Sequence, residues 1–126
     1  MDRRITRLKG YLTERFCEPL SLAEMAAQVN LSPSRLSHLF KREIGVPPQE
    51  FLKQVRMGHA KKLLEDSFLL VKEIMARCGF NDESHFVRDF EKLHGKTPRR
   101  YREDLLGSQD GFSKLGQRIA EEANKP

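Results

Sequence analysis

The sequence lacks the features that mark several classes of protein. Its 126 residues contain no tryptophan and only two cysteines, Cys17 and Cys78. The cysteines have neither CxxC spacing nor a histidine pair at ligand spacing, so we expect reduced thiols and no zinc site. No apolar run approaches the roughly 18 residues of a membrane-spanning helix, and the charged start MDRRITRLKG is not followed by the apolar stretch of a secretory signal. These absences predict a cytoplasmic protein with no metal, no cofactor and no membrane contact.

Motifs of enzyme active sites are also missing. The chain has four histidines, but none lies in a nucleophile motif, a glycine-rich phosphate loop or a run of metal ligands. Two of them, His38 and His85, lie on matching helix faces of a repeat described below, which favours a shared binding role over catalysis. We therefore expect that the protein is not an enzyme.

Positive charge is in excess. Lysine and arginine number 23 against 18 acidic residues, a net charge of +5. The excess lies in residues 1–106, which carry 20 against 15, because residues 107–126 carry three of each. A basic balance favours a polyanionic partner, either nucleic acid or an acidic membrane surface. A membrane-surface helix needs a free apolar face, whereas each apolar stripe here is expected to pack against other helices, so we favour nucleic acid.

Apolar residues recur at helical spacing along residues 1–106. Ile5, Leu8, Leu12 and Phe16 form the first such stripe. No segment shows sustained alternation with β-branched residues, so we expect an all-α fold without a sheet. The predicted helices cover residues 5–16, 22–29, 33–44, 48–66, 71–78 and 82–94, with a seventh that begins at 98.

Local signals set the expected ends of these helices. Ser21 and Glu24 have the spacing of a capping box, and Asn30 tolerates the left-handed conformation that stops a helix. Further N-caps are expected at Ser32, Asn81 and Thr97, and the residues expected to turn inward in 82–94 are Phe86, Phe90 and Leu93. Most of the core burial is expected from Phe40, Phe51, Phe86, Phe90 and Tyr101.

Residues 22–51 resemble residues 71–101. Glu24 matches Glu73, and after the offset grows by one residue Phe40 matches Phe90. Each copy predicts a short helix, a tight turn, a second helix, a glycine stop and a proline-started helix. The first two helices form a helix-turn-helix, and two copies in tandem are much stronger support than one. We expect a first helix-turn-helix subdomain at 1–47, a linker helix at 48–67, a second subdomain at 68–106 and a flexible tail at 107–126.

The outward face of each second helix is unusual for a solvated surface. In a helix-turn-helix this helix enters the major groove of DNA, so its outer face must be slim and must carry donors and acceptors. Serine, histidine and arginine satisfy both needs, and valine can pack on a thymine methyl group. The predicted base-reading residues are Ser34, Arg35, Ser37 and His38 in the first copy, and Glu83, Ser84, His85, Val87 and Arg88 in the second.

Helix N-termini and nearby cations are expected to hold the DNA backbone. An N-terminus offers free N–H groups and a positive dipole end to phosphate. The predicted phosphate contacts are Ser32, Lys41, Arg42, Asn81, Thr97, Arg99 and Arg100.

The linker helix suggests how one chain uses two such units. Its 19 residues, 48–66, extend about 28 Å, close to the roughly 34 Å between successive major grooves on one DNA face. A monomer could therefore contact two grooves, and we expect this chain to be monomeric. The alternative is an architectural DNA-binding module or a protein-interaction module that uses the same bundle without sequence preference.

The second copy resembles the DNA-binding domain of the AraC/XylS family of bacterial transcription regulators. The residues that carry the resemblance are Gly79-Phe80, Phe86-Val87-Arg88-Asp89-Phe90, Gly95, Pro98 and Tyr101-Arg102. It extends over about residues 3–106, and one departure is Glu91, where a lysine is common.

This resemblance implies a two-lobed, seven-helix domain that binds double-stranded promoter DNA in adjacent major grooves. It also implies that transcription is activated through RNA polymerase, and it assigns the base-reading positions to the residues named above. Most members of the family carry a sensing and dimerising domain before this one. The chain is therefore either an excised domain or a short, ligand-free member.

Overall fold

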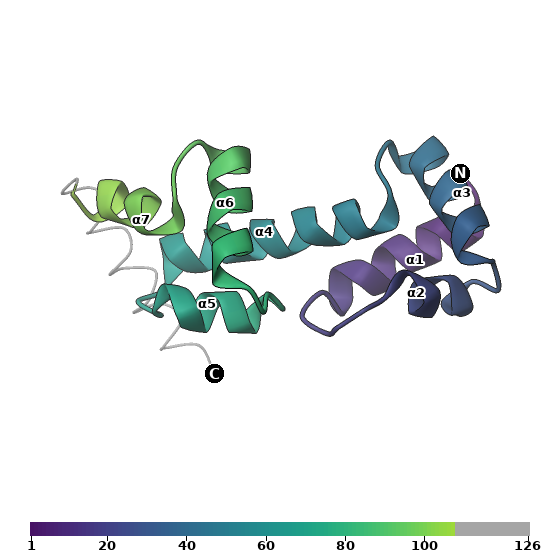
Figure 1. Cartoon of the computed structure of the whole chain (residues 1–126), viewed down its shortest axis with the longest axis horizontal. Coiled ribbons are helices and arrows are strands. Elements are labelled where there is room, and N and C mark those ends of the chain that lie inside the picture. Colours follow the sequence, from purple (N-terminus) through teal and green to yellow (C-terminus); the bar gives the residue numbers. More distant parts are fainter. Residues whose placement is uncertain (108–126) are drawn as a thin grey trace. The chain divides into compact units, whose positions relative to one another are not determined.

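A computed structural model describes residues 1–107 of the chain, which form seven α-helices and no strand (Figure 1). None of these helices is both long and apolar enough to cross a bilayer. The expected tail lies, from residue 108 onward, outside the described residues. The helices are α1 (Arg3–Glu14), α2 (Leu22–Gln28), α3 (Pro33–Ile44), α4 (Pro48–Asp66), α5 (Val71–Arg77), α6 (Glu83–His94) and α7 (Pro98–Gly107).

The chain divides into two compact units within α4. Unit 1 comprises Met1–Arg56, and unit 2 begins at Met57. Each unit therefore contains one helix-turn-helix, α2–α3 in unit 1 and α5–α6 in unit 2, together with one part of α4. The all-α architecture expected from the helical spacing is confirmed.

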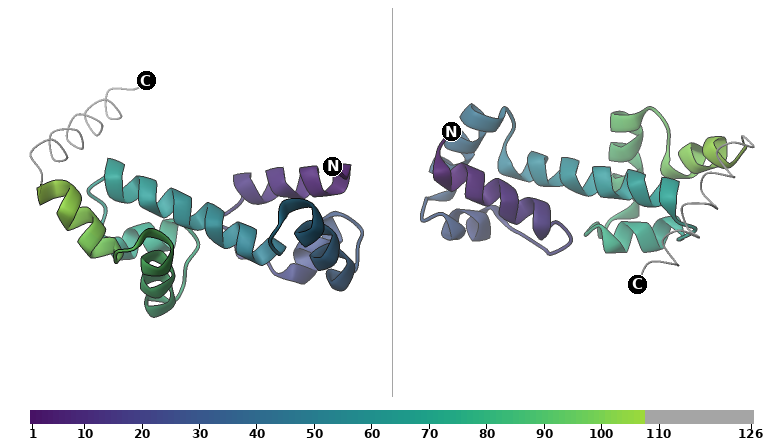
Figure 2. Two further views of the ribbon diagram at one scale, coloured as in Figure 1. Left: turned by 90° about the horizontal axis from the view of Figure 1, so that it is seen from above. Right: turned by 180° about the vertical axis from the view of Figure 1, so that it is seen from behind.

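Unit 1 has its core where α3 contacts both α1 and α2 (Figures 1 and 2). The predicted stripe of α1 is buried at Ile5, Leu8 and Leu12. The ring of Phe51 packs edge-on against Phe40, with 5.6 Å between the ring centroids. The remaining buried residues of this core are Met25, Ala26, Val29, Leu36 and Leu52.

The helix ends of unit 1 follow the local chemistry of the sequence. The Ser21 side chain accepts a hydrogen bond from the backbone N–H of Glu24 at 3.1 Å, and Ser32 accepts one from Arg35 at 3.2 Å. Asn30 has a positive φ of 56° at the turn, and Gly45 ends α3 with a φ of 99°. A side chain is strained at these angles, which explains asparagine and glycine there.

The first helix is shorter than its apolar stripe predicted. It ends at Glu14, so Phe16 lies beyond it and packs on the core from the following segment. The guanidinium of Arg56 donates hydrogen bonds to the carbonyl oxygens of Phe16, at 2.6 Å, and Glu18, at 2.8 Å. These bonds give partners to carbonyl groups of a non-helical segment, and the bond to Phe16 is partly buried.

Unit 2 has a core centred on the rings of Phe86 and Phe90, which have no exposed surface. Its α6 contacts both α5 and α7. Sequence reasoning identified both rings but did not predict Met57, which is 1% exposed. Within the described part of the chain, this unit also buries Ala60, Leu64, Ile74 and Cys78.

The prediction that Leu93 turns inward is wrong. Leu93 is 52% exposed, because the place one turn beyond Phe90 belongs to His94. The imidazole of His94 lies 4.5 Å from the Phe90 ring, measured between centroids. A histidine in an inward position is not signalled by an apolar pattern.

Polar contacts from α7 fasten it to the end of α4. The Tyr101 hydroxyl donates to a carboxylate oxygen of Glu65. The last carbonyl groups of any helix have no partner within the helix, and the Arg102 side chain supplies donors to this region. It donates hydrogen bonds to the backbone oxygens of Leu63 (3.3 Å), Leu64 (3.3 Å), Ser67 (3.1 Å) and Leu69.

Candidate nucleic-acid interface

The outward face of α3 is formed as the sequence predicts. Leu36 and Phe40 have no exposed surface and fix the helix on the core of unit 1. The candidate base-reading residues lie on the other side of the helix. Ser34, Arg35 and His38 are exposed, and Ser37 is half-buried.

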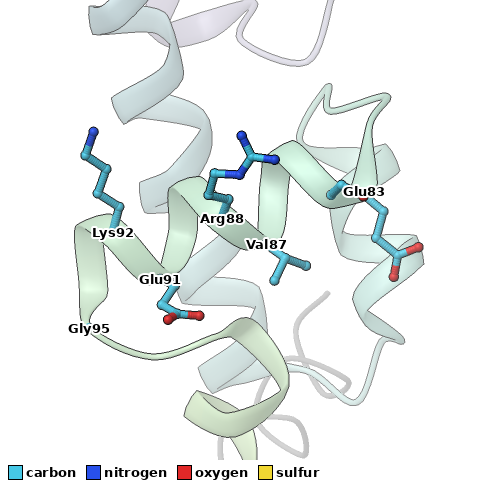
Figure 3. A pocket seen from close by; sticks show the side chains of 7 residues that line it. Glu83, Val87, Arg88, Glu91, Lys92 and Gly95 are labelled. Atoms are coloured by element: carbon cyan, nitrogen blue, oxygen red, sulfur yellow. The ribbon is translucent and has the colours of Figure 1, made fainter.

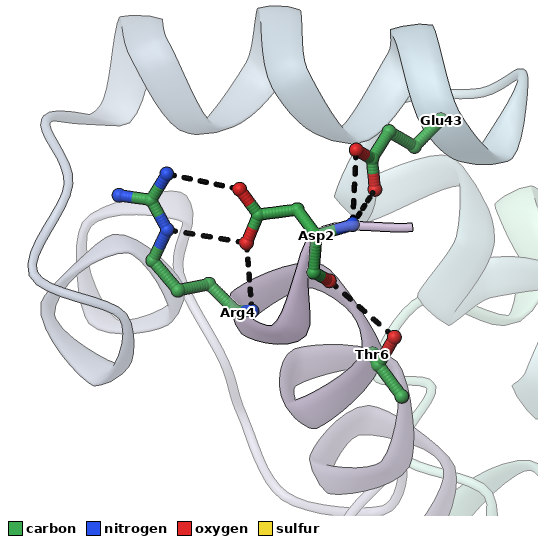
Figure 4. Close-up of polar contacts among 4 residues, drawn as sticks. All are labelled: Asp2, Arg4, Thr6 and Glu43. Carbon is green, nitrogen blue, oxygen red and sulfur yellow. Dashed lines mark hydrogen bonds and ion pairs between the residues drawn. The ribbon is translucent and has the colours of Figure 1, made fainter.

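The last turn of α3 carries a pair of cations and a link to the start of the chain. Lys41 and Arg42, both exposed, are the basic residues of this turn. On the same turn the Glu43 carboxylate accepts hydrogen bonds from the backbone N–H of Asp2, at 3.1 and 3.0 Å (Figure 4). This contact ties the end of α3 to the start of α1 and so helps to set how α3 lies in unit 1.

Asp2 is itself held by Arg4. Its carboxylate caps α1 through the backbone N–H of Arg4 at 2.8 Å and pairs with the guanidinium at 3.0 Å (Figure 4). The hydrogen bond from the Arg4 side chain lowers the pKa of Asp2 to about 2. The cap is therefore ionised at any pH at which DNA binding is measured.

The outward face of α6 presents the second candidate group. Phe86 and Phe90 anchor the helix, while Glu83, Ser84, His85 and Arg88 are exposed and Val87 is half-buried. An open surface depression follows this face. Its lining comprises Glu83, Ser84, Val87, Arg88, Glu91, Lys92 and Gly95.

Lys92 joins this face although the sequence reasoning did not select it. In Figure 3 the side chains of Arg88 and Lys92 project to the same side of α6. The spacing of four residues could have revealed this, because residues i and i+4 share one helix face. Two cations one turn apart suit an anionic partner, and Glu91 on the adjoining flank reduces the local positive charge.

The N-cap of α6 is Asp82, so the prediction of Asn81 as the cap is wrong. Asp82 stands fifty residues after Ser32, the N-cap of α3, and Asn81 is the residue inserted between the two copies. The backbone N–H of His85 donates to Oδ1 of Asp82 at 3.0 Å, and Nδ1 of His85 lies 3.2 Å from Oδ2. These contacts, led by the backbone hydrogen bond, lower the pKa of Asp82.

We call α3 and α6, which carry the candidate base-reading residues, the recognition helices; they differ at their N-termini. The first turn of α3 has no acidic residue, whereas α6 has Asp82 as its cap and Glu83 in its first turn. Negative side chains already satisfy the positive end of α6, so a phosphate is favoured more at α3. Because Asn81 does not cap α6, the capping argument for a phosphate contact at Asn81 no longer applies.

The start of α7 is capped as predicted. The Thr97 side chain accepts a hydrogen bond from the backbone N–H of Arg100 at 3.2 Å. The Arg100 guanidinium pairs with Asp104 at 3.1 Å, and Lys96 approaches the same carboxylate at 2.6 Å. These partners, first the hydrogen bond from Lys96, lower the pKa of Asp104. Arg99 is exposed on the same turn.

The described residues offer no place for a metal. Within residues 1–107 no group of three or more histidine, cysteine or acidic side chains is positioned to hold an ion. What the arrangement provides is two exposed helix faces with hydrogen-bonding groups and cations, each on a rigid apolar base.

Comparison with known proteins places these helices in a recognised family. A family model described as a helix-turn-helix domain matches residues 25–104. The chain is 37% identical over 95 residues to the transcriptional regulator YijO of Escherichia coli (strain K12), covering 75% of this chain and 34% of that protein. It is 35% identical over 102 residues to the transcriptional activator RhaS of Klebsiella pneumoniae (strain 342), covering 81% of this chain and 37% of that protein.

A solved structure has the same fold. It is the C-terminal domain of AraT, a response regulator from Geobacillus stearothermophilus, with a TM-score of 0.77 and 31% identity. The match covers 82% of this chain and 86% of that one. The chain spans about a third of the length of the curated relatives, 34% of YijO and 37% of RhaS.

Proposed function

Because the chain belongs to the AraC/XylS family and carries the DNA-binding helix-turn-helix domain of transcription regulators, we propose that α3 and α6 read the base sequence of a promoter. The two helices enter adjacent major grooves of one duplex. Binding as a monomer, the chain activates transcription through contact with RNA polymerase in the bacterial cytoplasm. The name of RhaS as an activator supports the sign of this regulation.

The duplicated recognition helix is the observation that carries the proposal. In α3 and in α6, buried side chains four residues apart hold the helix, while the opposite face is exposed. An architectural binder needs cations along its surface but has no need for hydrogen-bonding groups aimed outward from two groove-sized helices. A protein-interaction module would present aromatic or other apolar side chains at the centre of such a face instead.

Base reading falls to the exposed middle of each recognition helix. In α3 His38 points away from the core, and in α6 Arg88 does so from the equivalent position. A guanidinium can bridge two acceptors of one guanine, so Arg88 makes the stronger contact. The other proposed base-reading residues are Ser34, Arg35, Ser37, Glu83, Ser84, His85 and Val87.

Backbone contacts come from helix ends and nearby cations. Ser32 caps a helix end without acidic neighbours, and Lys41 and Arg42 lie at the other end of the same helix. In unit 2 the corresponding contacts come from Thr97, Arg99 and Arg100, with Asn81 as a weaker candidate. Such contacts set the register on DNA without reading its sequence.

Selection of binding sites from a random pool of duplexes tests the proposal. We expect a motif of two boxes whose centres lie about one helical turn, roughly 34 Å, apart. Helix α4, of which each unit contains one part, has 19 residues and therefore a length of about 28 Å. The selected duplex should then outcompete bulk DNA at one fixed salt concentration. Binding without any selected motif would favour the architectural alternative.

A further inference from the structure

The N-cap side chains of α3 and α6 differ in the number of oxygens that can accept a hydrogen bond. In α3 the one hydroxyl oxygen of Ser32 accepts the backbone N–H of Arg35 at 3.2 Å. In α6 Asp82 has two oxygens, and they have separate partners. Oδ1 accepts the backbone N–H of His85 at 3.0 Å, while Oδ2 lies 3.2 Å from Nδ1 of the His85 ring.

This second contact determines where the proton of a neutral His85 ring resides. An ionised carboxylate can only accept hydrogen bonds, so the 3.2 Å contact between Oδ2 and Nδ1 favours the neutral tautomer whose hydrogen is on Nδ1. A neutral imidazole has one N–H, so Nε2 then presents a lone pair. The His85 side chain is 67% exposed on the face of α6 assigned to base reading, so Nε2 is available to a ligand.

We propose that Asp82 is a positioning residue that fixes His85 as a hydrogen-bond acceptor at Nε2, and thereby selects the base that His85 contacts. This inference rests on the proposed function. The bases that offer an amino donor in the major groove are adenine, through N6, and cytosine, through N4. The box read by α6 should therefore favour adenine or cytosine at the position facing His85.

Replacement of Asp82 by asparagine should invert this preference. Asparagine is as good an N-cap as aspartate, so its oxygen keeps the bond to the backbone N–H of His85 and α6 is retained. Its amide nitrogen, a donor, then lies where Oδ2 was. Nδ1 must become an acceptor, and Nε2 takes the proton and donates to guanine O6 or N7, or to thymine O4.

Asp82→Ser is the matched control, because it copies the cap of α3. Serine keeps the helix start and leaves no second group beside Nδ1, so His85 is free to adopt either tautomer. A second control is His85→Gln, whose side-chain amide offers both an acceptor and donors without reference to Asp82. In that background Asp82→Asn should change nothing.

The first measurement needs no DNA. Nitrogen chemical shifts of the His85 ring, recorded on the free protein at about pH 8.5, two units above the ordinary pKa of histidine, distinguish the two neutral tautomers. We expect the proton on Nδ1 in the wild type and on Nε2 in Asp82→Asn. The same tautomer in both proteins would overturn the inference.

The second measurement is a titration against duplexes that carry each base pair at each position of the α6 box, at fixed salt and the same pH. The wild type should favour adenine or cytosine at one position by about threefold to tenfold, the contribution of one hydrogen bond. Asp82→Asn should reverse this preference and Asp82→Ser should abolish it. Positions that depend on Arg88 should keep their preferences in all three proteins.

The outcomes separate this inference from the function on which it rests. If Arg88→Ala changes the α6 box while Asp82→Asn leaves every preference unchanged, the inference fails and the proposed function stands. If the wild type discriminates at no position of either box, both fail together.

Discussion

The two units share a contact between two aromatic rings at corresponding positions. In unit 1 the rings of Phe40 and Phe51 are 5.6 Å apart at an interplanar angle of 66°, and in unit 2 those of Phe90 and Tyr101 are 5.8 Å apart at 70°. Both pairs join a recognition helix to the helix that follows it. The same ring contact therefore joins the corresponding helices in both copies.

The units differ in how the helix after the recognition helix is fastened. Fifty residues after Leu52, a core residue of unit 1 that is 3% exposed, unit 2 has Arg102. Leu52 packs in an apolar core, whereas Arg102 donates hydrogen bonds to backbone carbonyls at the end of α4. Unit 1 also has a carbonyl-binding arginine, Arg56, but it lies one turn further along its helix. At these corresponding positions unit 1 therefore has an apolar contact and unit 2 has polar ones.

The largest expected effect comes from removing the buried phenylalanine ring of this shared contact. Phe40→Ala and Phe90→Ala each remove a fully buried ring and should cost about 3–5 kcal/mol of unfolding free energy. Because each ring belongs to one unit, Phe90→Ala should unfold unit 2 and leave unit 1 folded, and Phe40→Ala should do the reverse. Amide spectra and hydrogen exchange, assigned unit by unit, measure this. A Phe90→Ala protein with a native, well-dispersed spectrum throughout would contradict the role of the ring.

The next largest effect tests the hydrogen bonds that Arg102 donates to backbone carbonyl groups in unit 2. Arg102→Ala removes charged donors from partly buried carbonyl groups and should cost about 2–3 kcal/mol of unfolding free energy. Arg102→Lys keeps the charge but loses the planar fork, so it should recover only part of the loss.

Arg100→Ala is the matched control, because the pair between Arg100 and Asp104 is exposed. The Arg100 side chain is 69% exposed and that of Asp104 36%, and such an exposed pair contributes little to stability. Denaturant titrations give the three values. If Arg102→Ala and Arg100→Ala lose the same unfolding free energy, the hydrogen bonds from Arg102 to the carbonyl groups stabilise the fold no more than an exposed ion pair does.

Local chemistry explains which parts of this structure could be predicted from the sequence. Ser21, Ser32 and Thr97 cap helices through bonds to residues three positions away, so the residue types reveal them. The left-handed turns at Gly45 and Gly95 are equally local. The exposed faces of α3 and α6 followed from the positions of the buried phenylalanines.

The failures have non-local or ambiguous causes. Arg102 contacts carbonyls 33 to 39 residues away, and no spacing rule indicates such partners. Asn81 and Asp82 are both good caps by residue type, and the spacing of fifty residues from Ser32, which identifies Asp82, was not applied. His94 takes the inward position in place of Leu93 because its ring packs at a tilt against Phe90, a contact that an apolar stripe does not encode. Which residues read bases stays a prediction.

A DNA-binding measurement compares the two recognition helices directly. Arg88→Ala should cost about 1–3 kcal/mol of binding free energy on the best site, with the loss confined to positions in one box. His38→Ala, at the equivalent position of α3, should give a smaller loss at the other box because histidine makes a single contact. Both variants are titrated against single-base variants of the site at one salt concentration. If Arg88→Ala weakens every duplex equally, Arg88 contacts the DNA backbone rather than a base.

The smallest effect concerns the pH dependence of unit 2. The Nε2 of His94 is buried without a hydrogen-bond partner among the described residues. Burial lowers the pKa of His94, and the charge of Lys61 lowers it further while that of Glu65 opposes the change. The unfolded chain therefore binds a proton at a higher pH than the folded unit does. The stability of unit 2 should be greatest above the ordinary histidine pKa of about 6.5 and should fall as the pH decreases below it.

Unit 1 supplies the control for this prediction, because its equivalent of His94 is Ile44, which packs against the core of unit 1. His94→Ile should remove the pH dependence of unit 2 between about pH 8 and pH 5.5, a range that lies above the ordinary pKa values of aspartate and glutamate. Thermal unfolding of wild type and variant, followed at both pH values, gives the comparison. A wild type whose unit 2 melts at the same temperature at both pH values, or a variant that keeps the full difference, would show that His94 does not carry the effect. His94 would then pack in unit 2 as Ile44 does in unit 1, without making the stability of unit 2 depend on pH.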